Sequence, residues 1–184
     1  MVFETDRLHI RKAMTSDEDV EMFFRLWNHP KVMINVGFPN GLGISKERIV
    51  EQFQKQSVTE YDSRLIVIRK EGDLKIGECM LGTPDENGVS KTDVKLLPEF
   101  WNNGYGKEIK QGLVNYLFTN RTDCQAVKAD PKKSNIASQK MQEYVRATRI
   151  ENGEEYPIKN VEKYFPPEDH YLYLVFRKDW RKAK

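Results

Sequence analysis

The stretch LLPEFWNNGYGKEI, residues 96–109, decides how this sequence is interpreted, because glycines there join two different periodic patterns. Residues 92–97 predict a short strand that ends at Pro98. After the glycines, apolar residues share one helical stripe, at Tyr105, Ile109, Leu113, Tyr116 and Leu117. The sequence therefore predicts a strand, a glycine turn and the start of a helix.

The glycine turn is typical of a site that binds an anion such as phosphate. The first N–H groups of a helix lack partners inside the helix, and glycine permits positive φ and close approach of a ligand. The better-known phosphate motifs do not match. A dinucleotide fold needs glycine at Ile109, and a Walker loop needs Ser or Thr after its lysine, whereas Glu108 follows Lys107. A glycine that only turns the chain into the helix is the alternative.

Composition predicts one domain, residues 1–184, with a hydrophobic core. The 184 residues are 39% hydrophobic, and no segment has the composition of a long linker. Lys and Arg number 30 against 28 acids, so the net charge of +2 does not favour nucleic-acid or membrane binding. Cys79 and Cys124 form no CxxC motif and lack a histidine cluster, which predicts buried thiols and no zinc site. A charged start and no long apolar run predict a cytoplasmic protein.

The remaining sequence predicts mixed strands and helices without repeats. Leu8 and Ile10 alternate with polar residues as in a half-buried strand, and Ser16 and Ser45 are typical N-caps of two helices. Between those helices, residues 35–43 are rich in turn formers and predict a mobile loop. Hairpin-type connections predict three antiparallel strands, at residues 65–68, 76–81 and 92–97. The last third predicts a strand at 126–129, a helix from 135 to about 145 and a late strand in HYLYLVF.

These segments resemble the GNAT superfamily of N-acetyltransferases, in particular the branch of ribosomal-protein N-terminal acetyltransferases of the RimJ and RimL kind. ETDRLHIRKAMTSDEDVEMFFRLWNHPKV is similar to the opening strand and helix of that branch, and IGECMLG to its third strand. LPEFWNNGYGKE resembles the acyl-CoA signature, SNIASQKM the later helix start, and HYLYLVFRKDW the closing strand. The resemblance implies an α/β (α+β) fold with a mixed, mostly antiparallel sheet flanked by helices, splayed at its fourth and fifth strands for acyl-CoA.

The resemblance also implies acetyl-CoA as cosubstrate, with no metal. Backbone amides of the turn are expected to hold the pyrophosphate, at Asn103, Gly104, Tyr105, Gly106 and Lys107. The preceding strand is expected to hydrogen-bond the pantetheine amides as an added strand would, through Lys95, Leu96 and Leu97. Lys107 and Lys110 are expected to meet the remaining phosphate charge. Asn135 is expected to bind the pantetheine arm, with an ordinary helix cap as the alternative.

Acetyl transfer to an amine needs a neutral nucleophile, whereas a free alkyl amine has a pKa of about 10.4. A carboxylate near the splayed strands is the expected base, and Glu78 and Asp93 lie on central strands. Exposure to solvent or pairing with a lysine is the alternative for each. A backbone N–H of the fourth strand is expected to meet the oxyanion. The resemblance indicates Ser138 as the group that donates to the leaving thiolate.

Two departures from the family bear on catalysis and on the acceptor. Many members carry a tyrosine acid at the position of Gln142, and the usual Gly-Phe after this helix is replaced by Arg146 and Ala147. By analogy with the branch, an acceptor wall is expected from Trp27, His29, Phe38 and residues 35–43, although Trp27 also fits a core position and His29 a helix end.

The resemblance implies an N-acetyltransferase that moves an acetyl group to a primary amine by direct attack in a ternary complex. The acceptor is expected to be a protein N-terminus or a small-molecule amine, and the protein a monomer or homodimer. A GNAT-like sensor or scaffold that binds acyl-CoA without catalysis is the alternative.

Overall fold

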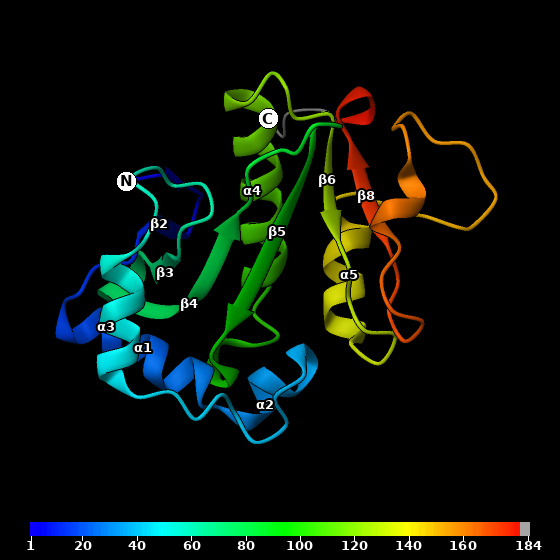
Figure 1. Cartoon of the computed structure of the whole chain (residues 1–184). Helices are drawn as coiled ribbons and strands as arrows, with labels where there is room; N and C mark the ends of the chain where they lie inside the picture. Colours follow the sequence, from blue (N-terminus) through cyan, green and yellow to red (C-terminus); the bar gives the residue numbers. More distant parts are fainter. Residues whose placement is uncertain (181–184) are drawn as a thin grey trace.

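The computed structural model describes residues 1–180. Its strands form one eight-stranded sheet in the order β1-β2-β3-β4-β5-β6-β8-β7 (Figure 1). The strands are β1 (Phe3–Glu4), β2 (Leu8–Lys12), β3 (Leu65–Arg69), β4 (Leu74–Leu81), β5 (Val89–Leu96), β6 (Ala126–Ala129), β7 (Thr148–Arg149) and β8 (Tyr173–Phe176). The α-helices are α1 (Asp17–Trp27), α2 (Pro30–Met33), α3 (Lys46–Gln54), α4 (Tyr105–Asn120) and α5 (Ile136–Tyr144). Neighbouring strands are antiparallel except β5 and β6, which confirms the mixed, mostly antiparallel sheet.

The helix starts follow the capping signals of the sequence. The side chain of Ser16 accepts a hydrogen bond from an N–H of the first turn of α1, and Ser45 does the same for α3. The connection between these helices differs from the prediction, because α2 and a 3-10 turn (Ile34–Val36) precede the remaining loop. Pro30 begins α2, a position where its missing N–H is harmless.

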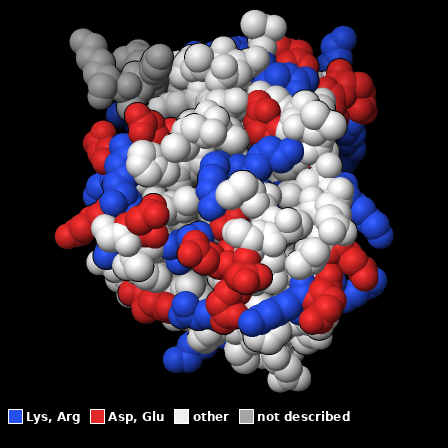
Figure 2. Space-filling view, turned by 90° about the vertical axis from the view of Figure 1, so that its left-hand side faces the viewer, with Lys and Arg blue, Asp and Glu red and all other residues white. Residues whose placement is uncertain are grey.

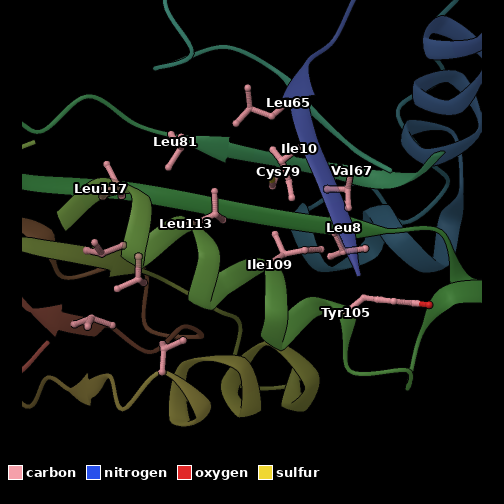
Figure 3. Packing of buried hydrophobic residues seen from close by; sticks show 14 of the residues in the cluster. Leu8, Ile10, Leu65, Val67, Cys79, Leu81, Tyr105, Ile109, Leu113 and Leu117 are labelled. Carbon is pink, nitrogen blue, oxygen red and sulfur yellow. The ribbon is translucent and has the colours of Figure 1, made fainter. Parts of the chain in front are cut away.

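The sheet carries a hydrophobic core on each face. On one face α4 packs against the strands, and Figure 3 shows Ile109, Leu113 and Leu117 on the side of α4 that faces them, with Ile109 next to Leu8. On the other face α1 and α3 bury a second cluster, in which Phe23 contacts the ring of Phe53 edge to face at 4.9 Å between centroids. The apolar stripes of these helices therefore position α4 and α1 on opposite sides of β4 and β5.

The sheet opens between β5 and β6. These strands pair only where residues 89–91 face residues 126–128, with Lys91 opposite Lys128. Beyond that point β5 continues beside β4 as far as Leu96, and β6 turns away towards α5 (Figure 1). Since Phe3–Glu4 is counted as β1, the strands predicted as fourth and fifth are β5 and β6. The predicted splay is confirmed.

Candidate active site

A cavity of about 900 Å³ occupies the opening between β5 and β6. Its walls come from the outer half of β5, the start of α4, the segment after β6, α5 and the 3-10 turn that follows α2. The predicted site residues that line it are Asp93, Lys95, Leu96, Gly104, Tyr105, Gly106, Lys107, Asn135 and Ser138. Three predicted residues, Glu78, Leu97 and Asn103, are not on this wall.

The glycine turn presents free backbone amides to the cavity. Gly104 is the N-cap of α4 with φ +79°, and no side chain caps the helix there. The first intrahelical hydrogen bond is donated by Glu108 N–H to Gly104 O at 3.2 Å, so the three amides of residues 105–107 precede it. These amides and the helix dipole suit an anionic group.

A long-range ion pair braces this turn, and sequence reasoning missed it. Arg7, on the loop before β2, donates from Nε to Glu108 Oε2 at 2.7 Å and from Nη1 to Asn103 O at 3.1 Å. Glu108 also accepts from the Thr5 hydroxyl. Burial of Glu108 favours its neutral form, but hydrogen bonds from Thr5 and Arg7 and the Arg7 charge lower its pKa below the ordinary value. Asn103 therefore contributes to the brace through its carbonyl group.

The two glycines of the turn have different roles. Gly104 adopts the left-handed conformation, whereas Gly106 lies inside the first turn of α4 without positive φ. A Cβ on Gly106 would lie 2.7 Å from Met141 Sδ, so this glycine permits α4 and α5 to pack closely. The positive φ predicted for the turn is therefore found at Gly104.

The free edge of β5 begins at Thr92. Backbone groups of alternate residues point to opposite sides of a strand, and Leu97 N–H donates to Ile76 O at 3.0 Å on the β4 side. Leu97 O accepts from Phe100 N–H at 3.0 Å, and its side chain lies in the core. The expectation for Leu97 is therefore corrected, since both of its backbone groups already have partners. By the same alternation, the backbone of residues 92, 94 and 96 faces the cavity, while the Lys95 backbone faces β4. On this edge Val94 N–H donates to Asp93 Oδ1 at 2.9 Å and Leu96 O accepts from Trp101 Nε1 at 2.8 Å, so Val94 C=O and Leu96 N–H are the groups directed at the cavity.

The residues predicted on α5 lie on the opposite wall. Asn135 is the N-cap, and its Oδ1 accepts from Ser138 N–H at 3.1 Å, which is the cap arrangement given as its alternative. Ser138 and Gln142 lie one turn apart on the cavity side of α5. Gln142 is buried and donates to Ser138 O at 3.3 Å, while its Oε1 has no hydrogen-bond partner. An unpaired buried oxygen in a ligand-sized cavity is suited to a donor on a bound molecule.

Glu78 lies behind the cavity wall rather than in it. Its side chain is 2% exposed, and Oε1 accepts from Trp27 Nε1 at 2.7 Å and pairs with Lys95 Nζ at 3.2 Å. Oε2 is buried without a hydrogen bond within residues 1–180, and it forms an ion pair with Arg64 Nη1 at 3.6 Å. Trp27 is buried as the core interpretation predicted, and its indole N–H also orients this carboxylate.

Asp93 lines the cavity beside Lys95, which links it to Glu78. Burial opposes ionisation of Asp93, but the charge and hydrogen bond of Lys95 lower its pKa below the ordinary value. Burial likewise opposes the charge on Lys95, and the two carboxylates outweigh it and raise the pKa of Lys95. Both predicted bases therefore belong to one ion cluster. Each pairs with a lysine, which was the alternative to a role as the catalytic base.

Lys110 differs from its expected role at the phosphates. It is 2% exposed, and its Nζ donates to Thr92 Oγ1 at 2.6 Å, inside the cavity rather than at the glycine turn. Burial lowers the pKa of Lys110 to about 7, against the opposing charges of Asp93 and Asp130.

The predicted acceptor wall is present in part. Asn35, Val36 and Gly37 line the cavity together with Phe100 and Trp101. Trp27, His29 and Phe38 do not line it, and Phe38 is exposed.

Comparison with known proteins agrees with this geometry. The family model described as "Acetyltransferase (GNAT) domain" matches residues 7–147, which include the β5 edge, the glycine turn and α5. This chain belongs to the GNAT acetyltransferase domain family. The matched range also contains Glu78, Lys110 and Gln142.

One curated relative is "Uncharacterized N-acetyltransferase p20" from Bacillus licheniformis, 30% identical to this GNAT domain over 117 residues. The match covers 62% of this chain and 65% of that protein, so the chain spans less than two thirds of its relative.

Solved structures show the same fold at low sequence identity. A GNAT-family acetyltransferase from Bacillus anthracis is 19% identical with a TM-score of 0.73, over 96% of this chain and 98% of that one. A spermidine N-acetyltransferase from Vibrio cholerae, solved with CoA and spermine, is 15% identical with a TM-score of 0.73. The match covers 95% of this chain and 98% of that one. An aminoglycoside acetyltransferase in complex with coenzyme A is 16% identical with a TM-score of 0.65. The match covers 93% of this chain and 95% of that one.

Outside the cavity, the described residues show no further candidate site. In Figure 2, acidic and basic side chains are interspersed on the face that lies to the left in Figure 1. Within residues 1–180, no helix combines the length and apolar character needed to cross a bilayer. In that same range, no group of three or more His, Cys, Asp and Glu side chains is arranged to hold a metal ion. Cys79 and Cys124 are buried free thiols, as predicted.

Proposed function

We propose that the chain, as one domain over residues 1–184, is an acetyl-CoA-dependent N-acetyltransferase of the RimJ/RimL-like branch. It transfers an acetyl group to a primary amine by direct attack in a ternary complex. The observation that supports this most strongly is the continuous path from the free amides of the glycine turn, along the unpaired edge of β5, into the 900 Å³ cavity.

The residues on this path fit coenzyme A. Amides of Tyr105, Gly106 and Lys107 would bind the pyrophosphate, and Gly104 would give the loop its conformation. Val94 C=O and Leu96 N–H, on the open edge of β5, would pair with the pantetheine arm as an added strand would. Asn135 and the free Oε1 of Gln142 would contact that arm from α5. When bound, acetyl-CoA supplies the activated acetyl group.

The Glu78–Lys95–Asp93 cluster would remove the proton of the acceptor amine. Both carboxylates pair with Lys95, but Glu78 is the stronger candidate for the base, because its Oε2 accepts no hydrogen bond, while the pKa of Asp93 is lowered. Trp27 would hold Glu78 in place. Since Glu78 lies behind the wall, an ordered water beside Asp93 and Lys95 would carry the proton to it.

The charges of the cavity bear on the acceptor. Lysines outnumber acids among the lining residues, which include Lys91, Lys95, Lys107, Lys110, Lys132 and Lys140 against Asp93 and Asp130. Both aspartates already have lysine partners, Lys95 for Asp93 and Lys91 for Asp130 at 3.3 Å. No lining carboxylate within residues 1–180 is left to bind a second ammonium group of a polycation. We therefore propose an acceptor with a single amine, such as a protein N-terminus.

The test is acetyl-CoA consumption with a short N-terminal peptide, spermidine and an aminoglycoside, each checked by the mass of the acetylated product. We expect the peptide to be acetylated faster than either polycation. Faster transfer to spermidine or the aminoglycoside would overturn the acceptor assignment. Binding of acetyl-CoA without transfer to any amine would favour the non-catalytic sensor instead.

A further inference from the structure

Lys110 is a buried lysine at the point where the two strands separate. It projects from the second turn of α4 and donates to Thr92 Oγ1, and Thr92 is the first residue of β5 beyond its pairing with β6. The side chain is 2% exposed, yet it lines the cavity. The cationic head of Lys110 is therefore directed at the inner end of the proposed pantetheine path.

This lysine has no carboxylate partner in the part of the chain that the structure describes. Within residues 1–180 it forms no ion pair, and the acids that act on it from a distance, Asp93 and Asp130, are bound to Lys95 and Lys91. Lys128 also lies 3.6 Å from Asp130. A buried cation without a counter-charge is costly. Such a group at the end of a ligand path is suited to meet negative charge on the ligand.

Ser138 and Gln142 on the opposite wall are not proton donors of comparable acidity. Both residues line the cavity, which Lys140 of α5 and His170 also line. A serine hydroxyl is a weak acid, and the Gln142 amide is not an acid at neutral pH. The free Oε1 of Gln142 also accepts rather than donates.

We propose that Lys110 is the acid that protonates the sulfur of coenzyme A as the acetyl group leaves. This inference rests on the proposed acetyl transfer. The acceptor nitrogen forms its bond to the carbonyl carbon, the C–S bond breaks, and its electron pair stays on sulfur. Lys110 gives one proton from Nζ to that sulfur, which yields the thiol. The proton lost by the acceptor nitrogen goes to the Glu78 cluster, and Lys110 regains a proton from solvent through the cavity.

The direction of this proton transfer is favourable. An ordinary thiol has a pKa of about 8.5, and burial lowers the pKa of Lys110 to about 7. Transfer from the ammonium to the thiolate is therefore favoured by roughly 30-fold. A lysine at its usual pKa would hold its proton too tightly for this step.

The test is the binding of coenzyme A and of desulfo-coenzyme A, which lacks the sulfur, measured by calorimetry at neutral pH. We expect the wild-type protein to bind coenzyme A roughly 10-fold to 150-fold more tightly than desulfo-coenzyme A, since hydrogen bonds to charged groups contribute about 1.5–3 kcal/mol. In Lys110→Met this preference should fall to about one. Methionine fills the buried site without an unpaired charge, so the variant is expected to fold. Lys55→Met, at the exposed end of α3, is the matched control and should keep the preference.

Kinetics provide the second readout. With a peptide acceptor, Lys110→Met should lower kcat by roughly 100-fold or more and leave the acceptor KM nearly unchanged. The wild-type kcat should also fall as the pH rises through about 7, because the acid must be protonated, and this fall should vanish in the variant.

Three results would overturn the proposal, in different ways. An unchanged thiol preference in Lys110→Met would refute the role of Lys110 and leave the proposed function intact. Failure of both coenzymes to bind the wild-type protein would refute both. Mass spectrometry showing an acetyl group on Lys110 after incubation with acetyl-CoA would make Nζ an acceptor of acetyl rather than a donor of a proton.

Discussion

Gly104 allows the most specific test of the turn, because a second glycine of similar geometry lies outside the site. Gly104 has φ +79°, and an added Cβ would meet only Arg7 Nη2, at 3.5 Å. Gly153 has φ +86°, and its Cβ would meet nothing within 4 Å. Gly104→Val and Gly153→Val therefore impose the same kind of backbone strain, and at neither position does the added Cβ clash. Each should lower the free energy of unfolding by about 1–3 kcal/mol.

The two variants should differ in their affinity for coenzyme A. Relief of the strain at Gly104 would rotate the amides of residues 105–107, which begin α4 and would bind the pyrophosphate. Loss of one hydrogen bond to a charged group costs about 1.5–3 kcal/mol, or roughly 10-fold to 150-fold in Kd. Gly153→Val should bind coenzyme A as the wild type does.

The assay combines urea unfolding of each variant with calorimetric titration of coenzyme A. Comparable stability losses with a weakened Kd in Gly104→Val alone would support a ligand-binding turn. If both variants lost stability and both kept wild-type affinity, Gly104 would only turn the chain, and the assignment of the pyrophosphate to this loop would be wrong.

Three further outcomes are expected. Glu78→Gln should lower turnover by about 100-fold to 10,000-fold with unchanged acetyl-CoA affinity. Its deficit relative to the wild type at the same pH should shrink at high pH, where more acceptor amine is neutral, and a deficit that is the same at every pH would exclude Glu78 as the base. Gly106→Ala should destabilise the fold because its Cβ would lie 2.7 Å from Met141 Sδ, and Met141→Ala should restore part of the loss in a thermal melt. The lowered pKa of Glu108 predicts a contribution to stability that is present above the ordinary pKa of 4.5 and is lost as the pH falls through the pKa of the folded state. Glu108→Gln should therefore make the free energy of unfolding fall less steeply at acid pH. A fall as steep as that of the wild type would contradict this.

Local patterns predicted the parts of the fold that depend on neighbouring residues. The caps at Ser16 and Ser45, the glycine N-cap of α4 and the N-cap at Asn135 depend on contacts a few residues apart, which periodicity and turn chemistry report. The two-residue strands β1 and β7 were not predicted, because they are too short to show alternation.

The site was less predictable where its contacts are distant in sequence. The bond from Trp27 to Glu78 and the brace from Arg7 to Glu108 join residues 51 and 101 positions apart. No spacing rule marks such pairs. Lys110 resembles a surface lysine in the sequence, and only the packing of α4 on β5 shows that its head is buried beside Thr92.

The orientation of the β5 backbone could not be predicted either. Residues 95 and 96 lie at the end of this strand as predicted, and Leu97 follows it, but which residues face the cavity depends on the register with β4. A shift by one residue would exchange the two sides. The hydrogen bond from Leu97 to Ile76 fixes that register and assigns the open side to residues 92, 94 and 96.

The central claim is that the opening between β5 and β6 binds acetyl-CoA, and thermal unfolding with and without this molecule tests it most directly. A ligand present at 100 times its Kd adds roughly 2.7 kcal/mol to the free energy of unfolding. We therefore expect saturating acetyl-CoA to raise the Tm of the wild-type protein, and to raise it much less in Gly104→Val. A wild-type Tm that is unchanged by saturating acetyl-CoA would contradict the proposed function.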